Sequence, residues 1–461
     1  MMKSENTFIN DSASFRDNAG VVFRDENGTV FRRINAVYEE KYRRLMSSGL
    51  YDELLNKHLL IPHKEIDGER PLIIRPKKIP YISYPYEWCF EQYRDAALAT
   101  LDIHITALSY GMMLKDASAY NIQWLNGWAV LIDTLSFEVY EEGQPWVAYG
   151  QFCRHFVCPL LLMSKVDERL GKLMNSFIDG IPLDLASAIL SGRGGVFGKL
   201  HIDIHGKSIE KHSTDRTQKQ VYMKKSAFLA LAKSLKEGIL ALKPPSKLTE
   251  WGEYYSHTNY SADSAKHKSD IVARFLDGIE NLKQVWDFGA NDGRYSRIAA
   301  KTAHVTAFDI DTNAVGRNYL EIRKSHEPIL PLILDLTAPS PAIGFGNTER
   351  NTIGGRVNRP GKAPADCILM LAVIHHLAVS NNLPFELIAR WVSELTEYLV
   401  IEFVPKSDSQ VQILLSTRDD IFTEYDETHF TESFGRYFDI CAREAIPDSE
   451  RIMFLMKRKR N

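Results

Sequence analysis

Apolar runs alternate with amphipathic segments in the second half of the chain, from about residue 251 onward. The apolar runs of strand length lie at residues 284–289, 305–310, 330–336, 366–373 and 398–405. They are apolar on both faces, which is typical of buried parallel strands. Helix-like segments at 294–303 and 312–325 follow the first two runs, and this alternation predicts a doubly wound α/β sheet. Two β-like runs around a Pro-Asp turn near the end of the chain predict an antiparallel pair at the end of that sheet.

The first half lacks this regular alternation and is predicted to hold a different module. Its polar start is expected to be flexible, and the region after it mixes short strands and helices in an α+β pattern. Residues 206–225 are polar and basic, and a solvated linker explains this charge run better than a nucleic-acid patch does. A helix follows and ends at Pro244-Pro245; its apolar residues, at steps of three and four, are Phe228, Leu231, Leu235, Ile239 and Leu242. The predicted parts are therefore a flexible N-terminus at 1–20, an α+β region at 21–205, a linker and helix at 206–250 and a second domain at 251–461.

The composition is that of a globular protein: 461 residues, 44% hydrophobic and 25% charged, enough for two or three domains. The formal net charge of -3 gives no support for a polyanionic partner. The five cysteines include no CxxC pair, so neither a disulfide framework nor a metal site is predicted, and a reducing compartment fits them best. There is no apolar leader segment and no apolar run of the ~18 residues that a membrane helix needs. We therefore expect a cytoplasmic chain.

In residues 285–293, VWDFGANDG, a strand-like apolar run ends at an acid and is followed by a turn with two glycines. Ligands of open α/β sheets bind beyond the carboxyl ends of the strands. Gly289 and Gly293 would allow a sharp turn and a close approach of the backbone to a ligand. The spacing is GxNxG and not GxGxxG, which argues against NAD. The turn therefore indicates a different nucleotide-like cofactor.

Two further acids end the next two strands. Asp309 lies 22 residues after Asp287, at the end of the second strand, where a carboxylate can accept hydrogen bonds from both hydroxyls of a ribose. Asp335 ends the third strand, where an acid can accept a hydrogen bond from the amine of an adenine. Each acid alone could merely cap a strand end or a helix start, as we expect for Asp311. Three acids at successive strand ends, with a glycine turn at the first, favour a cofactor site.

The motifs DFGANDG, AFDID, LILDL and LAVIHHL resemble those of class I S-adenosylmethionine-dependent methyltransferases, over roughly residues 251–461. The resemblance implies a Rossmann-like seven-stranded domain and S-adenosyl-L-methionine as the cofactor. It implies that the methionine part is held at Asp287, Gly289, Asn291 and Gly293, the ribose at Asp309 and the adenine at Asp335. Asn291 stands where the family usually has glycine, and asparagine accepts unusual backbone angles. More narrowly, IHHL, SNN, IEFVPK and SERIMFLMKRK are similar to a bacterial methyltransferase group that includes a nodulation host-specificity protein.

Methyl transfer from a sulfonium is an in-line displacement, so the enzyme mainly has to align donor and acceptor. A base is needed if the acceptor is a hydroxyl or a protonated amine. The candidate bases are His375 and His376, which follow the fourth strand, and Glu402, which ends the fifth. Because adjacent residues on an extended chain point in opposite directions, at most one of the two histidines is expected to face the acceptor. The alternatives are packing or capping for a histidine and an ion pair with Lys406 for Glu402.

Two segments are expected to shape the pocket. Residues 337–364 form a long connection rich in glycine and proline, which indicates either a lid or a disordered loop. Residues 249–268 carry aromatic and hydroxyl side chains that could close over the methionine end or form a surface helix on the sheet.

Residues 114–138 contain a second set of spaced polar residues. Asp116 is followed by Asn121 and, after a hairpin-like stretch turning at Asn126-Gly127, by Asp133. This spacing resembles the catalytic lobe of kinase-like phosphotransferases, where a catalytic-loop Asp and Asn precede a metal-binding Asp. No GxGxxG loop and no VAIK-like lysine can be assigned, so we expect a kinase-like region reduced to scaffolding or acceptor recognition. An active phosphotransferase and a chance spacing are the alternatives.

These features together predict a methyltransferase that acts on an unidentified acceptor and carries a kinase-like region before it. The alternatives are a phosphotransferase, a bifunctional kinase and methyltransferase, or a non-enzymatic interaction protein. A small molecule or glycan is expected as the acceptor, because the near-neutral charge disfavours nucleic acid, and no membrane partner is expected.

Overall fold

The computed structural model describes residues 9–66, 68, 71–204, 222–245, 262–357, 359–416 and 419–460. The chain divides into two compact units. Unit 1 comprises Met1–Lys247 and Ala342–Arg350, and unit 2 comprises Leu248–Pro341 and Asn351–Asn461. Among the residues described, no helix combines the length and the apolar character that crossing a bilayer requires.

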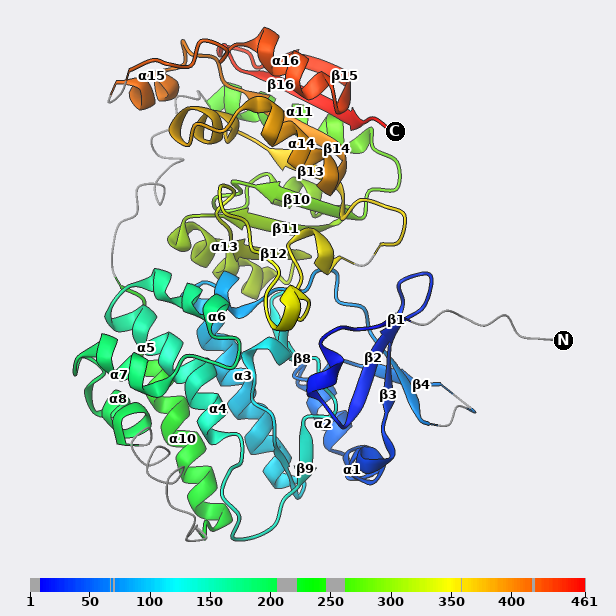
Figure 1. Ribbon diagram of the computed structural model, residues 1–461, viewed down its shortest axis with the longest axis vertical. Coiled ribbons are helices and arrows are strands. Elements are labelled where there is room, and N and C mark those ends of the chain that lie inside the picture. The colour runs from blue at the N-terminus through cyan, green and yellow to red at the C-terminus, as the bar shows by residue number, and fades with distance from the viewer. Residues whose placement is uncertain are drawn as a thin grey trace, which may run out of the picture. The chain divides into compact units, whose positions relative to one another are not determined.

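Unit 2 is built on a seven-stranded sheet with the order β12-β11-β10-β13-β14-β16-β15 (Figure 1). The parallel strands are β10 (Gln284–Phe288), β11 (His304–Asp309), β12 (Ile329–Ile333), β13 (Ala365–Met370) and β14 (Thr396–Phe403). The two remaining strands, β15 (Phe438–Ala445) and β16 (Ile452–Arg458), are antiparallel and extend the sheet beyond β14. Every residue of β10 is buried, as expected for a central strand covered on both faces. The mixed α/β architecture expected of the second half is therefore present.

Helices connect these strands. They are α11 (Ala262–Asp277), α12 (Ser296–Ala299), α13 (Thr312–Ser325), α14 (Phe385–Leu395), α15 (Ser409–Leu415) and α16 (Glu427–Gly435). The Asp311 side chain caps α13 by accepting from the backbone N–H of Asn313 and Ala314, as its place before the helix suggests. The helix expected at 294–303 is much shorter, because the chain is still turning at Gly293, with a φ of 83°, and regular α-helix begins only at Ser296.

In unit 1, five strands form a sheet with the order β1-β2-β3-β5-β4. Its strands are β1 (Ile9–Asn10), β2 (Gly20–Arg24), β3 (Val30–Ile34), β4 (His63–Glu65) and β5 (Ile73–Pro76), with α1 (Ala36–Ser47) and α2 (Leu50–Asn56) between β3 and β4. The N-terminal stretch expected to be flexible therefore forms β1 and a 3-10 turn at Ser14–Arg16 in its described part.

The rest of unit 1 is mainly helical (Figure 1). Its helices are α3 (Phe90–Ser109), α4 (Tyr149–Phe152), α5 (Cys158–Lys165), α6 (Leu173–Ser176), α7 (Leu183–Leu190), α8 (Gly195–Gly198) and α10 (Lys225–Ala241). Two hairpin-like pairs follow α3: β6 (Met112–Leu114) with β9 (Phe137–Val139), and β7 (Ile122–Leu125) with β8 (Trp128–Leu131). Most of the linker expected at 206–225 lies outside the described residues, and α10 is the helix expected after it.

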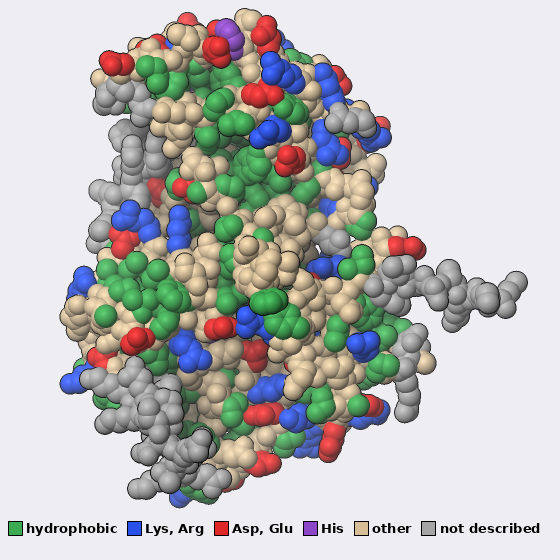
Figure 2. Space-filling view, viewed as in Figure 1, with side chains coloured by type: hydrophobic (Ala, Val, Ile, Leu, Met, Phe, Trp, Pro, Cys, Tyr) green, Lys and Arg blue, Asp and Glu red, His purple; other side chains and the backbone are tan. Residues whose placement is uncertain are grey.

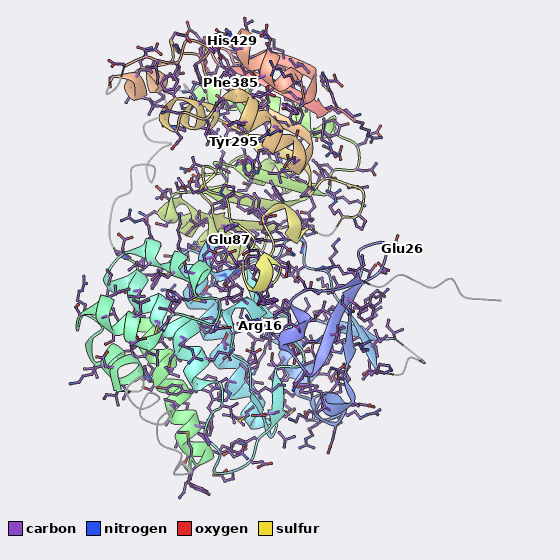
Figure 3. All side chains as sticks on the ribbon, in the orientation of Figure 1. Arg16, Glu26, Glu87, Tyr295, Phe385 and His429 are labelled. Atoms are coloured by element: carbon purple, nitrogen blue, oxygen red, sulfur yellow. The ribbon has the colours of Figure 1, made fainter. Side chains whose placement is uncertain are left out.

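One segment of the long connection at 337–364 belongs to unit 1, although the chain on both sides of it belongs to unit 2. In this 342–350 segment, the Glu349 carboxylate accepts from Nε and Nη2 of Arg16 at 2.5 and 2.9 Å. The Arg350 guanidinium lies 4.7 Å from the ring centroid of Tyr120. Arg16, labelled in Figure 3, lies beside the short helical turn of this segment. The predicted single domain from residue 251 onward is therefore interrupted, because these contacts hold the 342–350 segment in unit 1.

Candidate functional site

A cavity of about 430 Å³ lies in unit 2 where the parallel strands end. Its wall includes residues that follow or end β10, β11, β12 and β13, together with residues of α11. These residues meet because the strands are in register: Asp287 pairs with Ala307 of β11 and Leu369 of β13, and Asp309 pairs with Ile333 of β12. The residues that the sequence assigns to a cofactor and that line the cavity are Asp287, Gly289, Asn291, Asp309 and Asp335.

The turn after β10 depends on left-handed backbone angles. The φ values are 74° at Gly289, 49° at Asn291 and 83° at Gly293. A Cβ on Gly289 would lie 2.4 Å from Cγ2 of Val373, so only glycine fits there without movement. Asn291 takes the left-handed angle that asparagine tolerates better than most residues. Gly293 does not line the cavity and instead packs against Asn318, so its role is to shape the turn.

The first two acids of the wall are buried. The Asp287 carboxylate accepts from Oγ of Ser296 at 2.7 Å, and burial raises its pKa to about 7 against the opposing effect of that hydrogen bond. The Asp309 carboxylate accepts from the backbone N–H of Asn291 at 2.7 Å and of Asp311 at 2.9 Å, and burial raises its pKa to about 6. Both acids therefore lie where a bound cation or a hydroxyl donor would be favourable near neutral pH.

The third acid, Asp335, is only half-buried. Its Oδ1 accepts from the backbone N–H of Thr337 at 2.9 Å and from Oγ1 of Thr337 at 2.6 Å. Thr337 thereby fixes the orientation of a carboxylate that follows β12 and faces the cavity.

The two histidines differ from the expectation in their geometry. His375 and His376 begin a helical turn, and their rings lie 4.1 Å apart, so the alternation of an extended chain does not apply to them. His376 lines the cavity, whereas His375 is buried and does not. Burial lowers the pKa of His376 to about 4 and lowers the pKa of His375 well below its usual value, so both imidazoles are neutral at neutral pH.

Glu402 does not line the cavity and is fully buried. Its carboxylate pairs with Nζ of Lys268 at 2.6 Å and with Nη1 of Arg451 at 3.5 Å. The expected alternative partner, Lys406, pairs instead with Asp420 at 2.8 Å. The Glu402 carboxylate, expected as a candidate base, is therefore held between two buried cations and away from the cavity wall.

Lys268 is a cavity residue that the sequence analysis missed. It lies on the buried face of α11, in step with Ser264, Ile271 and Phe275. A lone lysine among apolar residues at helical spacing was the available signal. Tyr295, labelled in Figure 3, also lines the cavity. The aromatic residues expected near the methionine end lie at 251–260, outside the described residues.

In unit 1, the structure brings the three residues of the kinase-like spacing near one another. Asp116 accepts from Nδ2 of Asn121 at 3.0 Å and from Nε2 of Gln151 at 2.8 Å, and its pKa is raised by burial and by the nearby charge of Asp133. The expected hairpin is present, with φ values of 50° and 78° at Asn126 and Gly127.

The third residue of that spacing, Asp133, forms an ion pair with Arg32 of β3. Its carboxylate pairs with the Arg32 guanidinium, which also pairs with Asp17 at 2.5 Å. An arginine between two carboxylates neutralises the charge that a metal ion would require. Within the described part of the chain, no group of three or more His, Cys, Asp or Glu could hold a metal ion.

The sequence matches no family model. The chain is 31% identical over 407 residues to the nodulation protein NoeA of Rhizobium meliloti (strain 1021), a match that covers 86% of this chain and 84% of that protein. Among solved structures, magnesium protoporphyrin IX methyltransferase (ChlM) from Synechocystis PCC 6803 with bound SAH is 18% identical, covering 45% of this chain and 93% of that one at a TM-score of 0.31. The N-methyltransferase NodS from Bradyrhizobium japonicum WM9 is 12% identical. That match covers 43% of this chain and 99% of NodS, at a TM-score of 0.32.

Proposed function

The chain belongs to the family of the nodulation protein NoeA, and from this premise we propose that unit 2 is an S-adenosylmethionine-dependent methyltransferase. One observation carries the proposal. Acids that follow or end three neighbouring parallel strands, Asp287, Asp309 and Asp335, line one cavity beside a glycine turn. Its volume of about 430 Å³ lies in the range of small-molecule sites.

The residues present fit this cofactor. Asp309 would accept from the ribose hydroxyls and Asp335 from the adenine amine. Asp287 and the turn at Gly289 and Asn291 would hold the methionine part. When bound, the cofactor would supply a methyl group carried on a sulfonium, for transfer to an acceptor atom. The contribution of the chain is to hold donor and acceptor in line and to exclude water.

The acceptor is proposed to be a small molecule or a glycan. The net charge is -3, and on the face seen in Figure 2 the Lys and Arg side chains are interspersed with Asp and Glu. His376 is the proposed acceptor-facing residue, because it lines the cavity and its neutral imidazole can accept a hydrogen bond at neutral pH.

For unit 1 we propose scaffolding or acceptor recognition. The ion pair of Arg32 with Asp133 supports this, because it occupies the carboxylate that a phosphotransferase would use for its metal ion. The hydrogen bond between Asp116 and Asn121 favours the rival, a phosphotransferase or bifunctional enzyme. Titration of the whole chain with Mg-ATP separates the two: absence of binding heat supports the scaffold, and binding that Asp133→Ala abolishes supports the rival.

The cofactor assignment is tested by calorimetric titration with S-adenosylmethionine. The parent chain should bind it, and Asp309→Ala should bind it at least about tenfold more weakly, because the hydrogen bonds to an ionised group contribute about 1.5–3 kcal/mol. Equal affinity of the parent and Asp309→Ala would contradict the assignment.

A further inference from the structure

The proposed function leaves one ligand charge without an assigned partner. The methionine part of the cofactor carries a carboxylate as well as an ammonium, and the acids around the cavity suit only cationic groups and hydroxyl donors. A carboxylate buried beside Asp287 and Asp309 needs a cation of its own. Among the described residues of the cavity wall, those that carry such a charge are Lys268 and Arg294.

Lys268 is the buried one of these two. Its side chain is 3% exposed, and its Nζ lies 2.6 Å from Oε2 of Glu402 and 4.9 Å from the ring centroid of Tyr295. It is also close enough to Asp287 for the two charges to influence each other's pKa. The ammonium is therefore at the part of the wall formed by the β10 turn, where the methionine end is assigned.

The position of Lys268 is fixed by a chain of buried ion pairs. Glu402 pairs with both Lys268 and Arg451, and Arg451 in turn pairs with Asp408 at 2.7 Å. The four side chains carry two positive and two negative charges, so the cluster is balanced without a ligand. Such a network restricts the lysine rotamer before a ligand arrives, which is how binding sites gain affinity through preorganisation.

Arg294 is less suited to the same role. It is exposed, its Nη2 donates to the carbonyl of Ala265 at 3.4 Å, and its guanidinium lies 5.8 Å from the ring centroid of Tyr295. A solvent-exposed cation at the rim gives a weaker and more strongly screened attraction than a buried cation does.

We propose that Lys268 is the residue that binds the carboxylate of the methionine part, and that Glu402, Arg451 and Asp408 are its positioning residues. The inference rests on the proposed function, since it assigns a partner to one group of the proposed cofactor. Buried ion pairs by themselves add little stability to a folded protein. The proposal therefore gives the cluster of Lys268, Glu402, Arg451 and Asp408 a role in binding.

The test compares two ligands that differ only in this carboxylate: S-adenosylhomocysteine and decarboxylated S-adenosylhomocysteine. Calorimetry on the parent chain should show S-adenosylhomocysteine binding about tenfold to a hundredfold more tightly, the range for a hydrogen bond to a charged group. In Lys268→Met the two ligands should bind with about equal affinity, because only the ligand with the carboxylate loses a contact. The matched control is Lys266→Met, an exposed lysine on the same helix, which should keep the preference.

Each other outcome has a distinct meaning. If Lys268→Met weakens both ligands equally, the lysine has only a structural role and the inference is overturned. If the preference survives in Lys268→Met and disappears in Arg294→Met, the carboxylate belongs to Arg294 and the inference is likewise overturned. If the parent chain binds neither ligand, the proposed function itself fails.

Folding is controlled by a second variant. Lys268→Met leaves the buried Glu402 with one cation fewer, which can destabilise the chain. The double variant Lys268→Met/Glu402→Gln removes the charge together with its partner and leaves Arg451 paired with Asp408. It should fold with a thermal midpoint close to that of the parent and should also lack the preference for the carboxylate. A double variant that retains the preference would overturn the inference.

Discussion

Replacing Gly289 by alanine should destabilise unit 2, because two separate features of the turn exclude a side chain. The backbone at Gly289 is left-handed, with a φ of 74°. A Cβ there would also lie 2.4 Å from Cγ2 of Val373, well inside contact distance.

The magnitude follows from adding the two effects. A left-handed backbone costs an L-residue about 1–2 kcal/mol. Overpacking of one methyl against a buried side chain costs about 1–3 kcal/mol. We therefore expect Gly289→Ala to lower the free energy of unfolding of unit 2 by about 2–5 kcal/mol. In Gly289→Ala/Val373→Ala the clash is gone and the backbone strain remains, so the double variant should be less destabilised than the sum of the single variants by about 1–3 kcal/mol.

The assay must report on unit 2 alone, because two units need not unfold together. Hydrogen exchange of peptides from β10 and β13, followed along a urea series, meets this need. Gly435→Ala is the matched control, since a Cβ at Gly435 meets nothing within 4 Å and no left-handed φ is present there. Strictly additive free-energy changes in Gly289→Ala and Val373→Ala, or a neutral Gly289→Ala, would refute the reasoning.

Two other predictions concern buried carboxylates. Glu349→Ala should lower the free energy of opening of the 342–350 segment by about 1–3 kcal/mol, because the segment loses the ion pair of its buried Glu349 with Arg16, which is itself partly exposed to solvent. Faster hydrogen exchange of this segment in Glu349→Ala is the expected readout, and unchanged exchange would contradict it. The control is Glu39→Ala, which removes a more exposed ion pair with Arg43 and should leave the exchange of this segment unchanged. Burial raises the pKa of Asp287 to about 7 and that of Asp309 to about 6, so the folded chain retains protons that the unfolded chain releases from about pH 4 upward. The unfolding free energy of unit 2 without ligand should therefore fall as the pH rises from about 4 to about 7, and Asp287→Asn should reduce this fall; equal pH slopes for the parent and Asp287→Asn would contradict the assigned cause.

Much of unit 2 could be predicted from the sequence because its signals are local. The buried strands appear as continuous apolar runs, and α13 begins directly after Asp311, which caps it. The acids at successive strand ends meet because parallel strands bring their carboxyl ends to one edge of the sheet, so Asp287 and Asp309 could be placed together before their contacts were known.

The contacts that were missed join residues far apart in the sequence. Lys268 pairs with Glu402 across 134 positions, and Arg32 pairs with Asp133 across 101. No local pattern specifies either pair, because each depends on which strand or helix packs beside which. The 342–350 segment escaped prediction for the same reason: its glycine-rich sequence indicates a loop, whereas its place in unit 1 depends on Glu349 meeting Arg16.

The central claim is that S-adenosylmethionine binds at the carboxyl ends of β10 to β13. Hydrogen exchange with and without saturating S-adenosylhomocysteine tests it most directly, because the method locates the ligand along the whole chain. We expect slower exchange in peptides covering 287–295, 309–310, 334–337 and 371–377, the segments that contain residues of the cavity wall. Unchanged exchange in these four segments, or slower exchange confined to the 114–133 region of unit 1, would contradict it.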